Sequence, residues 1–172
     1  KGKMFTKIKK ATNLQNNETI LDVGSGPGEL SQLFQGEYAG VDYYKNYVSY
    51  AQKKYPGKKF FQGNVLDLSI AEKSYDTVLL ISFIHHFSDE EVEKILSNVS
   101  KIARKRVILL EPCLWKTNPL AWFLLKMDRG AHVRSFEKQK ELVEKYFIIN
   151  KAETFISGTY KLSIITAQPK VN

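Results

Sequence analysis

The stretch Leu21-Asp22-Val23-Gly24-Ser25-Gly26-Pro27-Gly28 decides how this sequence folds. It begins inside an apolar segment, residues 18–24, that reads as a buried strand, and it continues into closely spaced glycines. A glycine turn lets another molecule approach the backbone because no side chain intervenes, and a helix after the turn offers free backbone N–H groups. We therefore expect a nucleotide-like cofactor at this turn.

The spacing of the glycines indicates which kind of cofactor to expect. A dinucleotide-binding loop reads G-x-G-x-x-G, which would need glycine at position 29. This chain has Glu29 there and places its third glycine at Gly28. The spacing argues against NAD and for the shorter G-x-G-x-G turn.

A second acid follows at the distance that a ribose contact requires. Asp42 ends the next expected strand, residues 38–42. Neighbouring parallel strands place their carboxyl ends side by side, so Asp42 can reach a ribose that lies over the glycine turn. Asp42 could instead be an aspartate that merely ends a strand. Its occurrence together with the glycine turn favours ribose binding.

Strands and helices alternate along the rest of the chain. Strands are expected at residues 18–24, 38–42, 59–63, 75–82, 106–112, 148–156 and 159–167, and helices at 28–35, 46–55, 88–102, 120–127 and 135–147. The helix from Ser88 has a capping box with Glu91 and an apolar stripe. Continuous apolar strands are typical of a parallel sheet covered on both faces. The pattern predicts a doubly wound α/β fold, as a single domain over residues 1–172, with an antiparallel edge.

Composition excludes several other classes of protein. The one cysteine, Cys113, excludes an internal disulfide and a cysteine-rich zinc site. No apolar run approaches the ~20 residues that cross a bilayer, and the start lacks a secretion signal, so we expect a cytoplasmic protein. The net charge is +8, with lysines grouped at residues 1–10, 53–59 and 101–106. No arginine-rich stripe alternates with aromatics, so a solvated basic surface is favoured over nucleic-acid binding.

Several motifs together resemble the class I S-adenosylmethionine-dependent methyltransferases. They are the run 20–30, Gly40-Val41-Asp42, Phe61-Gln62-Gly63-Asn64-Val65, Tyr75-Asp76-Thr77-Val78 and Ile84-His85-His86-Phe87. The resemblance implies a seven-stranded, mostly parallel sheet of order 3-2-1-4-5-7-6, whose last strand is antiparallel. It also implies S-adenosylmethionine as cofactor, S-adenosylhomocysteine as product, and no metal.

The resemblance further implies which residues bind the cofactor. They are Asp22, Gly24, Ser25, Gly26, Gly28, Asp42, Tyr43, Asn64, Val65 and Ser82. The glycine loop would hold the methionine part and the ribose, and Asp22 would help to hold the amino group. Asn64 stands where the family usually has an aspartate, and its amide oxygen can accept a hydrogen bond from the adenine amino group.

Three histidines are candidates for the transfer itself. The protein mainly aligns the partners, and a base is needed only when the acceptor holds a proton tightly, as a sugar hydroxyl does. His85 and His86 follow the strand 75–82 and should lie beside the cofactor's methyl group; packing and helix capping are their alternative roles. His132 is the third candidate. Glu111, at the end of the strand 106–112, is a further possible base or acceptor-binding acid.

The segment after residue 112 is predicted to bind the acceptor. Residues 118–120 and 128–134 are similar to a subgroup of small bacterial methyltransferases found near polysaccharide-synthesis enzymes. Arg129 and Arg134 could bind a phosphate or carboxylate on the acceptor, or they could belong to a solvated loop with a salt bridge. The apolar helix 120–127 could pack in the core, cover the pocket, contact another subunit or touch a lipid-linked acceptor.

We therefore expect a methyltransferase that modifies a hydroxyl or carboxylate of a small-molecule, glycan or lipid-linked acceptor. Two alternatives stay open at this point. One is an RNA or protein methyltransferase, although the strand 75–82 lacks the Asn-Pro-Pro-Tyr type of sequence found in base-amine methylators. The other is a catalytically silent cofactor-binding protein of the same fold.

Overall fold

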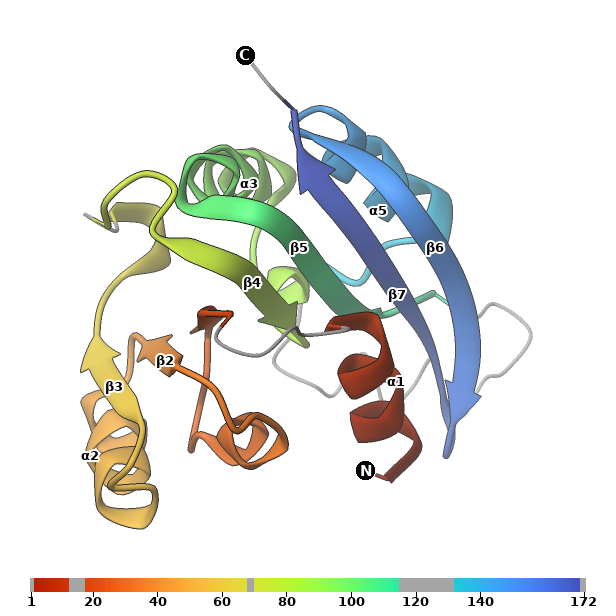
Figure 1. Ribbon diagram of the computed structural model, residues 1–172. Coiled ribbons are helices and arrows are strands. Elements are labelled where there is room, and N and C mark those ends of the chain that lie inside the picture. The colour runs from red at the N-terminus through yellow and green to blue at the C-terminus, as the bar shows by residue number, and fades with distance from the viewer. Residues whose placement is uncertain (1, 13–17, 68–69, 115–131, 171–172) are drawn as a thin grey trace.

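A seven-stranded sheet forms the centre of the molecule (Figure 1). The computed structural model describes residues 2–12, 18–67, 70–114 and 132–170. The strands are β1 Ile20–Val23, β2 Tyr38–Asp42, β3 Lys59–Gln62, β4 Tyr75–Ile81, β5 Ala103–Pro112, β6 Phe147–Ser157 and β7 Tyr160–Pro169. Their spatial order is β3-β2-β1-β4-β5-β7-β6, and β7 is antiparallel to both neighbours whereas the other pairs are parallel. The predicted fold class is confirmed.

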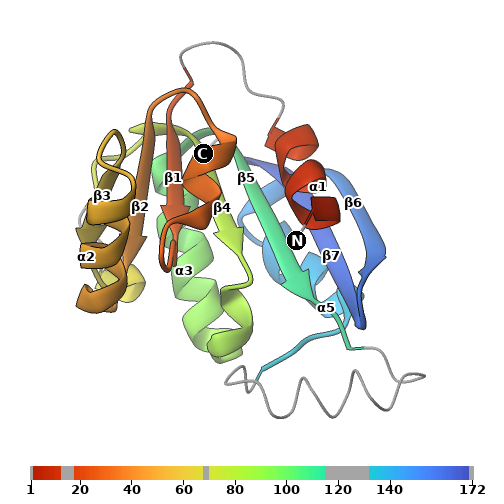
Figure 2. The same ribbon diagram turned by 90° about the horizontal axis from the view of Figure 1, so that it is seen from below.

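Helices cover both faces of the sheet. The described helices are α1 Gly2–Thr12, α2 Lys45–Lys54, α3 Asp89–Ile102 and α5 Phe136–Glu144. Short 3₁₀ turns follow β1, β3 and β4: η1 Glu29–Leu33, η2 Val65–Asp67 and η3 Ile84–His86. The second view shows α1 on one side of the sheet and α3 on the other (Figure 2). Among the described residues, no helix is long and apolar enough to cross a bilayer.

Alternate residues of each central strand enter two separate cores. In β1, Leu21 packs in the core with α3 and α5, whereas Ile20 packs in the core with α1 and α2. The same alternation places Val78 of β4 in the first core and Leu79 in the second. Because both faces are buried, these strands are apolar at nearly every position, as the sequence predicted.

Two predicted helices need correction, and a third lies outside the described residues. The helix expected at 28–35 is only the turn η1, which starts after Gly28 in the left-handed region, with φ 78°. The helix expected at 135–147 ends at Glu144, because Phe147 is buried in the core and pairs with Pro169 in the sheet. The apolar helix 120–127 lies outside the described residues.

Helix α1 was not predicted, although its apolar residues have the spacing of an amphipathic helix. It carries basic residues and only a few apolar ones. Its Ile8 is fully buried in the core formed with η1 and α2, and Met4 packs against the same core. Most helical stability in proteins comes from packing of this kind rather than from intrinsic propensity.

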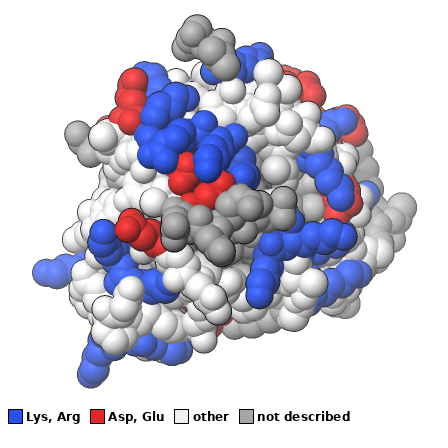
Figure 3. All heavy atoms as spheres, in the orientation of Figure 1, with Lys and Arg blue, Asp and Glu red and all other residues white. Residues whose placement is uncertain are grey.

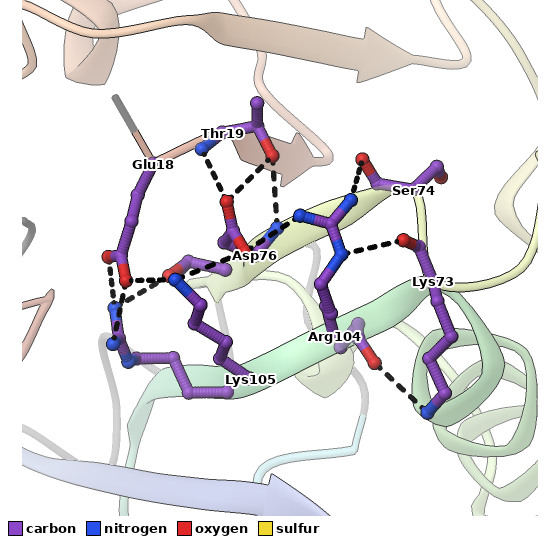
Figure 4. A network of polar contacts seen from close by, with 10 residues as sticks. Glu18, Thr19, Lys73, Ser74, Asp76, Arg104 and Lys105 are labelled. Carbon is purple, nitrogen blue, oxygen red and sulfur yellow. Dashed lines mark hydrogen bonds and ion pairs between the residues drawn. The ribbon is translucent and has the colours of Figure 1, made fainter. Parts of the chain in front are cut away.

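The basic residues at the start of β5 are paired within the protein. Lys105 and Arg106 donate to the buried carboxylate of Glu18, at 2.8 and 2.7 Å, and Arg104 donates to Asp76 at 2.8 Å (Figure 4). Burial by itself would raise the pKa of Glu18, but the hydrogen bonds from Arg106 and Lys105 outweigh it and lower that pKa. Figure 3 shows Lys and Arg side chains gathered around acidic ones on this face. The pairing gives the basic residues Arg104, Lys105 and Arg106 a structural role within the protein.

Candidate cofactor and acceptor site

A cavity of about 590 Å³ opens at the carboxyl ends of β1, β2 and β4. Its lining residues are Val23, Gly24, Gly26, Val41, Asp42, Tyr43, Tyr44, Tyr47, Gly63, Asn64, Val65, Ser82, Phe83, His86 and Phe87. Ligands of open α/β sheets bind at this edge, at the point where the strand order reverses on either side of β1. The sheet order places that point between β1 and β4. The cavity therefore has the position expected of a cofactor site.

The glycine turn forms one wall of the cavity. Gly24, Gly26 and Gly28 all have left-handed backbone angles, with φ of 74°, 52° and 78°. A Cβ at Gly24 would lie 2.1 Å from the Phe83 ring, and one at Gly28 would lie 2.7 Å from the Phe60 ring. A Cβ at Gly26 would meet nothing within 4 Å. The outer glycines are thus required by packing, whereas Gly26 presents bare backbone to open space.

Asp42 joins the end of β2 to this turn. Its Oδ2 accepts the N–H of Gly26 at 2.8 Å, and its Oδ1 accepts the N–H of Tyr44 at 2.9 Å. Each carboxylate oxygen has two acceptor sites, so one on each oxygen remains for a ligand. The carboxylate is thereby oriented at the cavity wall and can accept two neighbouring hydroxyl groups.

The segment after β3 also contributes to the cavity lining. Asn64 Oδ1 accepts the N–H of Leu66 at 3.1 Å, and Asn64 Nδ2 donates to Asp67 at 3.1 Å. These bonds cap the turn η2 and place Asn64 and the buried Val65 on the cavity lining. The amide of Asn64 therefore has a local structural role in addition to the adenine contact expected from the sequence.

Three predicted cofactor residues, Asp22, Ser25 and Gly28, do not line the cavity. Asp22 is buried, and its carboxyl group accepts the hydroxyl of Tyr38. Burial raises the pKa of Asp22 to about 7, against the opposing hydrogen bond from Tyr38. The hydroxyl of Ser25 lies close to Gly40 on β2, 2.7 Å from where a Cβ of that glycine would be. Neither side chain is among the residues that line the cavity.

The two neighbouring histidines have different environments. His86 is exposed and lines the cavity together with Phe83 and Phe87, whose rings lie 4.9 Å apart. His85 is buried, and its Nδ1 lies 2.6 Å from Oε2 of Glu111. Ser82, at the start of this segment, also lines the cavity and has a left-handed φ of 51°. Of the pair, His86 is the one that can contact a ligand in the cavity.

The predicted acceptor residues are only partly brought together. Arg134 is 7% exposed, and its guanidinium donates to the carbonyls of Ile84 and Phe87 and to Asp89. Those contacts favour a structural role for Arg134 over the predicted acceptor contact. His132 is exposed and donates its backbone N–H to the carbonyl of His85. Arg129 lies outside the described residues.

The aromatic part of the lining was not predicted from the sequence. Tyr44 and Tyr47 line the cavity and form a chain of ring contacts with Tyr43, and Phe83 and Phe87 line it as a second aromatic pair. The tyrosines are spaced three apart at the start of α2, and the phenylalanines flank the histidine pair. A search for aromatic residues just after the predicted strand ends would have found both pairs.

Comparison with known proteins identifies the family. Residues 21–110, more than half of the chain, match the family model described as a methyltransferase domain. The chain belongs to this family. The matched residues run from β1 through the glycine turn and the histidine pair into β5, so they contain all of the residues that line the cavity. A search of curated proteins found no match.

Solved structures share the fold of this methyltransferase at low sequence identity. YcgJ from Bacillus subtilis superposes with a TM-score of 0.81 at 15% identity and covers 99% of this chain and 100% of its own. A SAM-dependent methyltransferase from Methanosarcina mazei has a TM-score of 0.77 at 18% identity, covering 93% and 96%. Magnesium protoporphyrin IX methyltransferase from Synechocystis PCC 6803, solved with bound SAH, has a TM-score of 0.77 at 20% identity, covering 98% and 81%. Family and fold together make this chain an S-adenosylmethionine-dependent methyltransferase.

Proposed function

We propose that this methyltransferase modifies a small-molecule, glycan or lipid-linked acceptor at a hydroxyl or carboxylate group. The cavity beside the glycine turn would hold the cofactor, and the acceptor would enter at the end formed by Phe83, His86 and Phe87. The observation that carries this proposal is that the bare backbone of Gly26, the oriented carboxylate of Asp42 and the side chain of His86 line one cavity.

The residues at the cofactor end fit S-adenosylmethionine. The open space at Gly26 allows close approach to the backbone, and the two unused acceptor sites of Asp42 match the two hydroxyls of a ribose. Val65 offers an apolar surface to a flat base, and Tyr43 lines the same cavity. When bound, the cofactor supplies an electrophilic methyl group on a sulfonium.

The chain's own residues then have to orient the acceptor and remove a proton. The apolar rings of Phe83 and Phe87 line the cavity beside His86 and would exclude water from a bound acceptor there. A hydroxyl acceptor needs a base, and a ring nitrogen of His86 is the group on the lining that can take its proton. A carboxylate acceptor carries no such proton and needs only alignment.

Two further observations support a small-molecule acceptor. The basic side chains at the start of β5 are paired with Glu18 and Asp76, so they do not form an unpaired basic surface for an anionic polymer such as RNA. The structural neighbour from Synechocystis is named for a small-molecule acceptor, magnesium protoporphyrin IX. RNA and protein acceptors are the alternatives that the experiment must separate.

The test is a methyl-transfer assay with S-adenosylmethionine labelled on its methyl group. Candidate acceptors are pooled as hydroxyl compounds, carboxylic acids, glycans, lipid-linked sugars, RNA and protein. We expect label in a small-molecule, glycan or lipid-linked pool, and S-adenosylhomocysteine binding by calorimetry. Label only in RNA or protein would reject the acceptor class. Cofactor binding without transfer to any pool would favour a catalytically silent protein.

A further inference from the structure

The turn η3, which carries both histidines, is bound at its amino end by a buried carboxylate. Glu111 Oε1 accepts the N–H of Phe83 at 2.7 Å and the N–H of Ile84 at 2.9 Å. Glu111 is 1% exposed and stands at the end of β5. The first N–H groups of a helical turn have no partner within the turn, so this carboxylate satisfies them.

The carbonyl groups of the same segment are bound by a buried cation. Arg134 donates from Nη1 to the carbonyl of Ile84 at 3.0 Å and from Nη2 to the carbonyl of Phe87 at 2.7 Å. Its Nε donates to Asp89 at 2.7 Å, and this bond lowers the pKa of Asp89. The segment 83–87 is therefore held by a negative group at its amides and a positive group at its carbonyls.

Glu111 and Arg134 belong to two stretches of chain that are themselves joined. Cys113 and Arg134 form a parallel bridge, and the N–H of Leu114 donates to the carbonyl of Arg134 at 3.1 Å. Gln139 of α5 donates to the carbonyl of Pro112 at 3.0 Å. The end of β5 and the start of α5 thus form one rigid support behind the turn.

His85 connects this support to the cavity. Its Nδ1 faces Oε2 of Glu111 at 2.6 Å, and its carbonyl accepts the N–H of His132 at 3.0 Å. Its ring centroid lies 4.1 Å from that of His86. Where Glu111 is a carboxylate it can only accept, and this hydrogen bond then requires the proton to be on Nδ1 of His85.

We propose that Glu111, His85 and Arg134 are positioning residues that set the ring of His86 at the acceptor end of the cavity. Glu111 holds the proton of His85 on Nδ1 and so fixes the orientation of that ring, against which His86 packs. Among the described residues, Glu111, His86 and His132 contact His85, and Arg134 binds the neighbouring Ile84 carbonyl and Asp89. This proposal rests on the proposed function in one respect, namely that the methyl acceptor binds at the His86 end of the cavity.

Nuclear magnetic resonance of the histidine rings tests the proposal without an acceptor. The chain has three histidines, so their ring nitrogens can be assigned by substituting each in turn. In Glu111→Gln, the single remaining oxygen stays with the two backbone N–H groups and the amide nitrogen faces Nδ1. We expect the wild-type signal of a protonated His85 Nδ1 to be lost and the His86 signals to shift. Arg134→Lys should shift the His86 signals as well.

Matched controls exist at the amino ends of β4 and β5. Asp76 is also a buried carboxylate that accepts a backbone N–H and a cationic side chain, and Arg104 is its partner (Figure 4). Asp76→Asn and Arg104→Lys should leave the His86 signals where they are in the wild type. If Glu111→Gln does not fold, His85→Asn keeps a donor at the Nδ1 position without the ring, and the His86 signals should still shift.

Three outcomes would overturn the proposal. They are a protonated Nδ1 that persists in Glu111→Gln, His86 signals that are the same in all site variants as in the wild type, and an equal shift in Asp76→Asn. Addition of S-adenosylhomocysteine tests the proposed function separately. If it neither binds nor moves any histidine signal while the variants behave as expected, the proposed function fails and the positioning roles stand.

Discussion

Gly26 donates its backbone N–H to Oδ2 of Asp42 at 2.8 Å, and this bond ties the turn after β1 to the end of β2. The bond has two consequences. It fixes the left-handed glycine turn in the conformation that leaves Gly26 facing open space. It also fixes the orientation of the carboxylate, so that the hydrogen-bonding positions left on its two oxygens face the same part of the cavity wall.

Removal of the Asp42 carboxylate should weaken cofactor binding. Asp42→Ala loses the proposed ribose contacts and the bond to Gly26, so we expect the affinity for S-adenosylhomocysteine to fall by roughly 5- to 100-fold, about 1–3 kcal/mol. Isothermal titration calorimetry measures it. Glu72→Ala, an exposed acid outside the cavity lining, is the control. Equal affinities in Asp42→Ala and the wild type would refute the ribose assignment.

The central glycine should be needed for binding more than for folding. Gly26→Val places its side chain in the open space of the cavity, so the variant should fold, with a loss of about 1–2 kcal/mol for the left-handed φ, and should not bind S-adenosylhomocysteine. Gly158→Val is the control, since its φ is 61° and a Cβ there also meets nothing within 4 Å, but it lies in the β6–β7 turn. Urea unfolding and calorimetry compare the two. Normal binding by Gly26→Val would mean that the turn does not approach the cofactor.

The buried Asp22 should make stability depend on pH. Its folded-state pKa of about 7 lies above the usual 3.8, so between those values the folded protein holds a proton that the unfolded chain has released. The contribution of Asp22 to the free energy of unfolding therefore decreases as the pH rises through this window, by at most about 1.4 kcal/mol per unit.

Asp22→Asn removes this dependence while keeping an oxygen for the Tyr38 hydroxyl. We expect the stability of the variant relative to the wild type to increase from pH 5 to pH 8, as measured by urea unfolding at each pH. The pKa of Asp76 is lowered: burial would raise it, but the hydrogen bonds from Thr19, Lys105 and Arg104 outweigh that effect. The difference in stability between Asp76→Asn and the wild type should therefore stay constant over the same pH range. A flat curve for Asp22→Asn would show that Asp22 is already ionised at pH 5.

Truncation of Arg134 should cost more stability than truncation of a surface arginine. Arg134→Ala leaves the carbonyls of Ile84 and Phe87 without this donor, so we expect a loss of about 1–3 kcal/mol in urea unfolding. Arg104→Ala removes an ion pair whose arginine side chain is 48% exposed, and should cost less than about 1 kcal/mol. If Arg134→Ala is no less stable than Arg104→Ala, Arg134 does not hold the segment 83–87.

The alternation of strands and helices and the place of the cavity beside the glycine turn could be predicted from patterns that are local in the chain. These patterns are apolar runs buried on both faces, glycines where the backbone is left-handed, and an acid at the end of the following strand. The order of the strands was implied by the resemblance to a known family, and the structure confirms it. The capping box of Ser88 and Glu91 is likewise local, and the structure contains both of its bonds.

The roles of Glu111, His85 and Arg134 were decided only by the tertiary structure. Glu111 reaches the N–H of Phe83 across 28 positions of sequence, and Arg134 reaches the carbonyl of Ile84 across 50. No local pattern indicates which charged side chain near a cavity faces the ligand and which faces the backbone behind it. That outcome depends on which unpaired backbone groups the packed sheet and helices bring within hydrogen-bonding distance, because a buried charge is stable only where such partners meet it.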